Sequence, residues 1–258
     1  MGSPTKTRDA AYKYIVRVLF EKQGKEWIPV HSLPIQENDW FVAFDGKCLG
    51  KINNGTKLVI SGTNNSYYEL QDNPNIPHVK PMTTNFNGWM EGGNVPLFRP
   101  LVLVTKQNYT DPQNWKPFNP IDSIIDRCIL SFRKTIGSVV FCDSIHGDKP
   151  TSDYNRSTII TGKCYHSNEG EILISLYLNY KLFKCEVSET GGTKWFLFDK
   201  HGKMQLLNIP GSDLLDAGDY DSDGLSELIF SSGGYNKDGY LLLYDSLKKQ
   251  VENNWSYH

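Results

Sequence analysis

The sequence predicts an all-β fold of short antiparallel strands with at most one short helix. Runs rich in Val, Ile, Leu, Tyr and Phe alternate along the chain with polar turn segments. Its 258 residues include 22 glycines and 13 prolines, which are spread between these runs and break them. A hydrophobic content of 39 % and an aromatic content of 12 % are typical of a globular chain that buries a core.

The predicted strands follow one another at short intervals. They include YIVRVLF, EWIPVHS, PLVLVTK, CILSFRK, SVVFCDS, EILISLYL, ELIFSSGG and YLLLYDS. The best candidate for a helix is NPIDSIIDRCIL, with Asn119 as its cap and Pro120 in its first turn. This segment overlaps CILSFRK, so its composition allows a helix or a strand.

A weak repeat predicts how the strands are arranged. WFVAFDGKCLGKI from Trp40, WFLFDKHGKMQLL from Trp195 and YLLLYDSLKKQVENNWSYH from Tyr240 share one plan of aromatic strand, polar turn and second strand. Repeated meanders of this kind are the units of β-propellers. We therefore expect a propeller of five to seven antiparallel four-stranded blades, with aromatic rings such as Trp195 between blades. The terminal strands YKYIVRVLF and VENNWSYH should lie in one blade or in adjacent ones.

We expect one domain over residues 8–258. Residues 1–7, MGSPTKT, are expected to be disordered or a remnant of cloning. They lack the apolar stretch of an export signal. Pro, Gly and Asn are frequent around residues 64–119, which suits either a linker between domains or a long insertion into one domain. Strand signals resume in similar style on both sides, which favours the insertion.

Charge and hydropathy exclude some partners. The net charge is −2 and no long cluster of Lys or Arg occurs, which disfavours nucleic acid and anionic membranes. No run approaches ~18 consecutive apolar residues, so no membrane span is predicted.

The cysteines allow two interpretations. Their spacing excludes a CxxC zinc or redox pattern, and their odd number leaves at least one unpaired. Either they are small buried hydrophobic residues, or one disulfide joins Cys128 to Cys142 or Cys164 to Cys185. The five are Cys48, Cys128, Cys142, Cys164 and Cys185.

The segment DYDSDGLSELIF predicts a calcium site. Carboxylates alternate at its start, and Gly224 permits a sharp turn directly after them. Ca²⁺ takes six to eight oxygen ligands, and without a cation carboxylates this close repel one another. The expected ligands, four carboxylates and one backbone carbonyl, are Asp219, Asp221, Asp223, Glu227 and Leu225. An EF-hand is excluded because Phe230 stands where its bidentate glutamate belongs.

The longer segment AGDYDSDGLSELIFSSGGYNKDGYLLLYD resembles the FG-GAP repeat of integrin α-chain propellers and their bacterial relatives. The resemblance covers residues 214–258. It implies a propeller blade with Ca²⁺ in a loop between two strands, held by the same five ligands.

Two other loops carry candidate ligand-binding residues. FNGWMEGGN places Trp89 and Glu91 among glycines. Either the Trp89 ring is exposed and stacks on a sugar, or it packs under its own loop. CDSIHGDKPTSDYNRS places His146, Asp148 and Asp153 on a polar loop, as a metal or acid–base site or as ordinary surface polarity. Neither loop contains a recognised catalytic motif.

Three hypotheses for the function follow. The first is a non-catalytic, calcium-stabilised β-propeller that presents loops to a protein or glycan outside the cytoplasm. The second is a carbohydrate-active propeller enzyme with a carboxylate pair. The third is an accessory domain of a larger surface protein. The absence of a catalytic motif favours the first.

Overall fold

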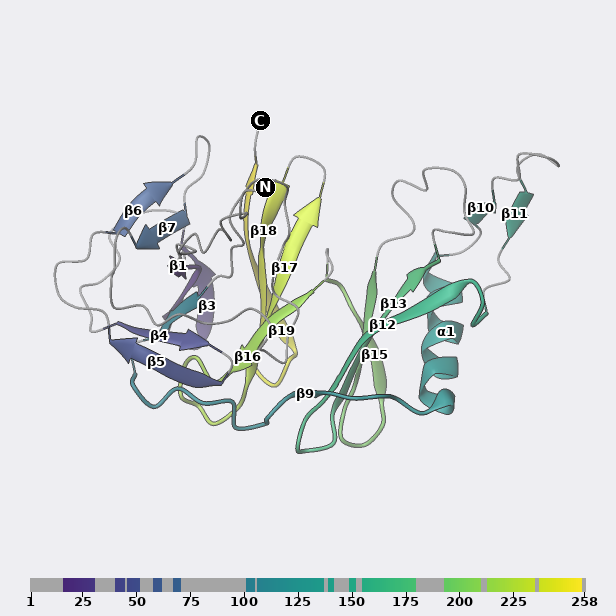
Figure 1. Ribbon diagram of the computed structural model, residues 1–258, viewed down its shortest axis with the longest axis horizontal. Helices are drawn as coiled ribbons and strands as arrows, with labels where there is room; N and C mark the ends of the chain where they lie inside the picture. The colour runs from purple at the N-terminus through teal and green to yellow at the C-terminus, as the bar shows by residue number, and fades with distance from the viewer. Residues whose placement is uncertain are drawn as a thin grey trace, which may run out of the picture.

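The described part of the protein is built mainly of antiparallel β-sheet with one helix (Figure 1). The computed structural model describes residues 16–30, 40–44, 46–51, 58–61, 67–70, 101–104, 106–136, 139–141, 149–151, 155–179, 193–209, 213–234 and 237–256. In this part of the chain, no helix is long and apolar enough to cross a membrane.

The N-terminal part forms a six-stranded sheet and a separate hairpin. The sheet has the order β5-β4-β8-β1-β7-β6, in which only β1 and β8 pair in parallel. Its strands are β1 (Val16–Val18), β4 (Phe41–Phe44), β5 (Lys47–Lys51), β6 (Leu58–Ser61), β7 (Tyr67–Leu70) and β8 (Leu101–Val104). The hairpin consists of β2 (Phe20–Gln23) and β3 (Glu26–Pro29).

Two meanders of consecutive antiparallel strands follow. The middle sheet has the order β15-β14-β13-β12-β9, and the C-terminal sheet has the order β16-β17-β18-β19. The middle strands are β9 (Lys116–Pro117), β12 (Ile159–His166), β13 (Ile172–Leu178), β14 (Lys194–Phe198) and β15 (Met204–Leu207). The C-terminal strands are β16 (Leu214–Gly218), β17 (Glu227–Gly234), β18 (Lys237–Tyr244) and β19 (Lys249–Ser256). A short pair, β10 (Val139–Phe141) and β11 (Lys149–Thr151), lies apart.

The helix α1 (Asp122–Ile136) confirms the predicted helix and extends it. It begins at Asp122, and the Ile121 carbonyl accepts the Ile125 N–H at 3.4 Å, so the prediction of Asn119 as the cap is wrong. The interpretation of CILSFRK as a strand is also wrong. Its buried side chains, Cys128, Ile129 and Phe132, follow the helical period and pack on the middle sheet.

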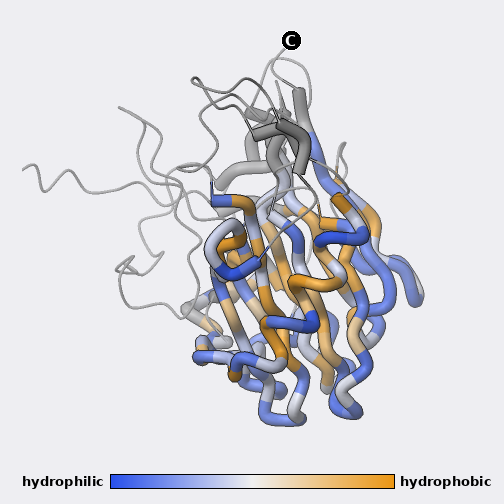
Figure 2. Tube along the Cα trace, turned by 90° about the vertical axis from the view of Figure 1, so that its right-hand side faces the viewer, coloured by the Kyte–Doolittle hydropathy of each residue, from blue (hydrophilic) through white to orange (hydrophobic). Residues whose placement is uncertain are grey.

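The sheets stack in layers that fan outward from the C-terminal sheet (Figure 1). One face of this sheet packs on the middle sheet, and the other packs on the N-terminal strands. The helix covers the outer face of the middle sheet. Figure 2 shows hydrophobic residues following the strands and hydrophilic residues at the turns. The core therefore lies in three contacts between successive layers.

Trp195 lies between the two meanders, as the repeat predicts. Its side chain is fully buried, its ring meets that of Phe230 edge-on at 5.2 Å, and it stacks on Tyr165 at 6.3 Å. Within the described ranges, however, the sheets neither close nor curl into a ring. A propeller therefore stays a prediction, and the observed architecture is an open stack of antiparallel sheets.

The three repeated segments all form antiparallel hairpins, as expected. They are β4–β5, β14–β15 and β18–β19. The two ends of the described chain also meet: the Asn253 side chain on β19 donates to the Leu19 carbonyl at 2.6 Å, and both residues are buried. The hairpin β2–β3 and the C-terminal sheet thus lie in adjacent layers.

We expect Trp195→Ala to lower the free energy of unfolding by about 3–5 kcal/mol, because it leaves a cavity between two sheets. Leu206→Ala on the neighbouring strand is the control, since Leu206 is 38 % exposed. Its cost should stay below about 1 kcal/mol. Chemical denaturation measures both. Equal costs for the two variants would contradict the interlayer position of the Trp195 ring.

Candidate metal centre

The acidic loop, residues 219–227, connects β16 to β17 at the end of the C-terminal sheet. Three of its carboxylates converge: Asp219, Asp221 and Glu227 each place an oxygen within 4.8 Å of the others. Asp219 and Asp221 are half-buried, and Glu227 is buried. This arrangement offers oxygen ligands to one cation from two aspartates and one glutamate.

The backbone of the loop wraps around the Asp219 carboxylate. Its two oxygens accept hydrogen bonds from the N–H groups of Asp223 and Gly224, each at 3.0 Å. Gly224 has a φ of 91°, in the left-handed region that favours glycine, and Ser222 has a φ of 63°. The sharp turn predicted at Gly224 is confirmed, and it brings Glu227 back toward Asp219.

Asp223 and Leu225 are not part of this group. Asp223 is exposed, and its Oδ1 accepts the Leu225 N–H at 2.8 Å. The carboxylate group within 4.8 Å contains the other three acidic residues of the loop. Coordination by Asp223 and by the Leu225 carbonyl therefore remains a prediction.

Glu227 is the buried carboxylate of the loop. It is 2 % exposed, and its Oε2 accepts the Tyr220 N–H at 2.8 Å. Burial, followed by the negative charges of Asp221, Asp223 and Asp219, raises the pKa of Glu227 to about 9. Without a cation, this carboxyl keeps its proton at neutral pH. A bound divalent cation would favour the ionised form instead.

Lys22 of β2 supplies a positive charge beside the loop. Its Nζ forms an ion pair with Asp221 Oδ2. The same ammonium group lies 5.2 Å from the centre of the Trp27 ring and 5.7 Å from that of Tyr244. Because 199 positions separate Lys22 from Asp221, no local sequence signal indicates this contact.

A cavity of about 410 Å³ opens next to this ion pair. Its lining is strongly charged and carries both signs, so it resembles a hydrated cleft more than an apolar pocket. The lining residues are Lys22, Gly24, Lys25, Asp221, Asp223, Asp245 and Lys249.

Gln113 holds the end of the loop. Its Oε1 accepts the Ser226 N–H at 2.9 Å, and its Nε2 donates to Glu171 at 2.7 Å. The Ser226 hydroxyl donates to Asp111 at 2.6 Å. The start of the loop is held by the same segment, because the Asp219 N–H donates to the Thr110 carbonyl at 2.8 Å. The segment before β9 thus fixes both ends of the acidic loop.

Beneath the loop, two tyrosines lock the end of β16. Tyr220 donates its hydroxyl hydrogen bond to buried Asp216 at 3.1 Å, and Tyr109 donates to the Ala217 carbonyl at 3.2 Å. The two rings stack with centroids 5.2 Å apart. The DYD pattern indicates metal ligands only. It gives no sign of the contact between Tyr220 and Tyr109, because Tyr109 is distant in the chain.

The remaining predicted site residues lie outside the described ranges. They are Trp89, Glu91, His146, Asp148 and Asp153. Cys142 and Cys185 are also outside them, whereas Cys128 and Cys164 are buried free thiols. For these two, the interpretation as small hydrophobic residues is confirmed.

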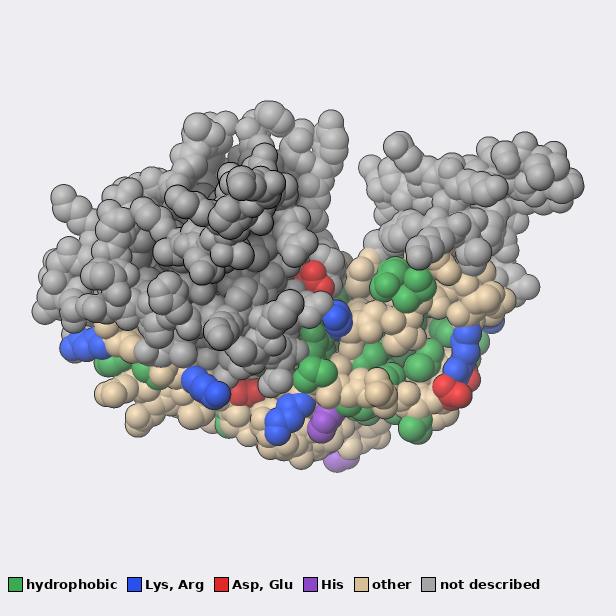
Figure 3. Space-filling model, viewed as in Figure 1, with side chains coloured by type: hydrophobic (Ala, Val, Ile, Leu, Met, Phe, Trp, Pro, Cys, Tyr) green, Lys and Arg blue, Asp and Glu red, His purple; other side chains and the backbone are tan. Residues whose placement is uncertain are grey.

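One face of the molecule can be followed in a space-filling view. On the face drawn in Figure 3, the described acidic and basic side chains are interspersed, with no extended patch of one sign. Comparison with known proteins adds no family: no family model, no curated protein and no solved structure matches the chain.

We expect Gln113→Ala to lower the free energy of unfolding by about 1–3 kcal/mol, because it leaves the buried Ser226 N–H without an acceptor. The matched control is Gln205→Ala on β15, whose side chain is exposed. Chemical denaturation of both variants in the absence of calcium gives the comparison. If Gln113→Ala were as stable as Gln205→Ala, the loop would not depend on this anchor.

Proposed function

We propose that the protein is a non-catalytic, calcium-stabilised binding module with propeller-like sheets. The observation that carries the proposal is the convergence of Asp219, Asp221 and Glu227 within 4.8 Å at the end of one sheet. Ca²⁺ bound there offsets the repulsion between these carboxylates and ties β16 to β17.

The chemistry of the donors favours calcium among common metals. The group contains carboxylate oxygens and no thiolate or imidazole, and such oxygens suit hard cations. The exposed residues of the loop, Ser222, Asp223 and Gly224, leave room for water and for a backbone carbonyl. Ca²⁺ tolerates such an irregular shell, whereas Mg²⁺ demands near-octahedral geometry.

A carbohydrate-active enzyme is the second candidate. One observation favours it, because a glutamate with a raised pKa is the usual general acid in glycoside hydrolysis. Glu227, however, is 2 % exposed and bonded to the Tyr220 N–H, so a sugar ring has little access to it. Burial and the neighbouring carboxylates account for the raised pKa of Glu227 without requiring a substrate.

The sheet arrangement supports the binding module. Two consecutive four-stranded meanders, β12–β15 and β16–β19, pack face to face through large apolar side chains, as neighbouring blades do. We propose that they are blade-like units whose connecting loops present side chains to a protein or glycan. Extracytoplasmic modules bind calcium weakly and meet enough of it outside the cytoplasm, and we propose that location.

The first prediction is that Ca²⁺ raises the melting temperature. At ~100-fold excess over Kd, an ion bound only by the folded state adds about 2.7 kcal/mol, which corresponds to roughly 5–10 °C for a chain of this length. Differential scanning calorimetry with Ca²⁺ and with EDTA measures the shift. Identical melting curves after complete chelation would contradict the calcium site.

The second prediction separates the carboxylates of the loop. Asp221→Asn should weaken Ca²⁺ binding about tenfold or more, because it removes a charged ligand from the converging group. Asp223→Asn, at an exposed position, should weaken it less. Isothermal titration of the two variants gives both affinities. Equal losses would favour the four-carboxylate set that the FG-GAP resemblance implies.

The third prediction concerns Lys22, which competes for Asp221. Lys22→Gln removes a positive charge beside the site and should tighten Ca²⁺ binding about two- to fivefold, equivalent to roughly 0.5–1 kcal/mol. Lys25→Gln is the matched control, because Lys25 is exposed in the same hairpin. Its affinity should change less. A weaker calcium affinity in Lys22→Gln would contradict the competition.

A further inference from the structure

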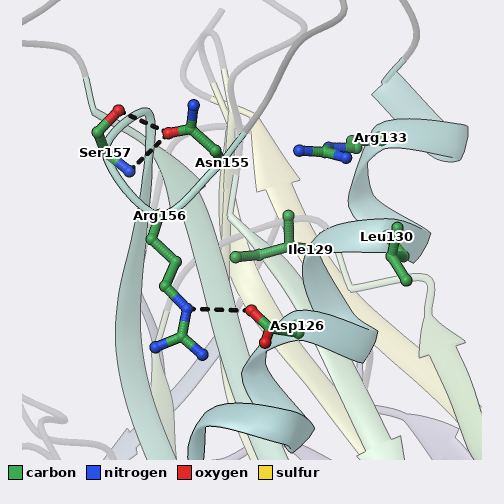
Figure 4. A pocket seen from close by; sticks show the side chains of 7 residues that line it. All are labelled: Asp126, Ile129, Leu130, Arg133, Asn155, Arg156 and Ser157. Atoms are coloured by element: carbon green, nitrogen blue, oxygen red, sulfur yellow. Dashed lines mark hydrogen bonds and ion pairs between the residues drawn. The ribbon is translucent and has the colours of Figure 1, made fainter.

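A second cavity lies between α1 and the turn that precedes β12 (Figure 4). Its volume is about 500 Å³, within the range of roughly 300–1,000 Å³ that holds small ligands. The lining residues are Asp126, Ile129, Leu130, Arg133, Asn155, Arg156 and Ser157.

The two arginines of this cavity differ in their partners. Arg156 is neutralised, because its Nε donates to Asp126 at 3.0 Å and its Nη1 donates to Asp122 at 2.5 Å. Its Nη2 donates to the Asp122 carbonyl at 2.9 Å. The guanidinium of Arg156 is therefore held at the wall of the cavity with all three nitrogens engaged.

Arg133 has no such partner in the part of the chain that the structure describes. Its Nε is shielded from solvent and makes no hydrogen bond. Figure 4 shows its guanidinium reaching from α1 toward Asn155, with Ile129 below them in this view. A shielded arginine donor without an acceptor is unfavourable, and the charge of this guanidinium favours an oxyanion in the cavity.

Asn155 offers a second donor at the edge of the cavity. Its Oδ1 is occupied, because it accepts from the Ser157 N–H at 2.8 Å and from the Ser157 hydroxyl at 2.5 Å. These two bonds fix the amide, so its NH₂ group is the end left for a ligand. Arg133 and Asn155 thus present hydrogen-bond donors from two elements that meet at one cavity.

The remainder of the lining is aliphatic. Ile129 is 5 % exposed, whereas Leu130 is 55 % exposed and is one of the three exposed large hydrophobic residues of the described chain. An alkyl chain that covers Leu130 removes apolar surface from water. The cavity therefore combines a donor pair for an anion with an apolar wall.

We propose that this cavity binds a small aliphatic carboxylate. Its carboxylate accepts hydrogen bonds from Arg133 and Asn155, and its alkyl chain lies against Ile129 and Leu130. A monoanion fits better than a phosphate dianion, because the carboxylates of Asp122 and Asp126 stand near the same wall and repel added negative charge. A planar guanidinium and a planar carboxylate can also form two parallel hydrogen bonds with each other.

Titration with octanoate, followed by two-dimensional NMR of the calcium-loaded protein, tests the proposal. We expect saturable shifts at residues of α1 and the turn before β12. Arg133→Gln should weaken octanoate binding at least tenfold, whereas Lys134→Gln, which removes the same charge at an exposed position one residue along, should not. Octanamide and acetate should bind much more weakly than octanoate.

Three results would overturn the proposal: no saturable octanoate binding, equal affinity in Arg133→Gln and the parent, or octanamide binding as tightly as octanoate. Leu130→Gln guards against a folding defect in Arg133→Gln, because Leu130 is exposed. This variant should weaken octanoate binding severalfold, and unchanged affinity would count against the apolar contact. Repeating the titration with EDTA separates this cavity from the calcium site, since octanoate affinity should not depend on calcium.

Discussion

Burial of the C-terminal sheet on both faces is the constraint on which the other layers depend. Successive residues of its strands point to opposite sides: Leu228 and Phe230 pack on the middle sheet, whereas Ile229 packs on the N-terminal strands. The same alternation occurs in β18. A strand buried on both faces needs a continuous apolar run, and LIF and YLLLY are such runs.

This central position explains why the acidic loop is well supported. The loop joins two strands of a sheet that cannot shift without disturbing both neighbouring layers. Residues from both sides reach it, with Lys22 from the N-terminal hairpin and Gln113 from the segment that leads to the middle sheet. Carboxylates that repel one another stay close because the surrounding layers hold their backbone in place.

The two candidate sites occupy different parts of the stack, and the group left unbalanced differs between them. In the acidic loop, excess negative charge is only partly offset by Lys22, and the buried Glu227 keeps a proton. Beside α1, the imbalance is a shielded guanidinium nitrogen with no acceptor. In each case an unsatisfied group next to a cavity points to a ligand of opposite charge. Neither site shares a residue with the other.

Sequence alone determined the features that depend on neighbours along the chain. The β-rich class, the hairpin from Tyr240, the turn at Gly224 and the alternation of Asp219 and Asp221 each act over a few residues. Local signals were insufficient where two structures suited one segment. CILSFRK has the composition of a strand, and it became helical because Cys128 and Phe132 lie on one helical face against the middle sheet.

Tertiary structure alone decided the contacts between distant segments. Lys22 reaches Asp221 across 199 positions and Gln113 reaches Ser226 across 113, and no periodicity or turn signal extends that far. It also decided that Asp223 stands apart from the three converging carboxylates. Among the described residues, Arg133, unlike Arg156, has no carboxylate partner. The physical reason is that such contacts depend on how whole sheets stack, which is set by the fit of many side chains at once.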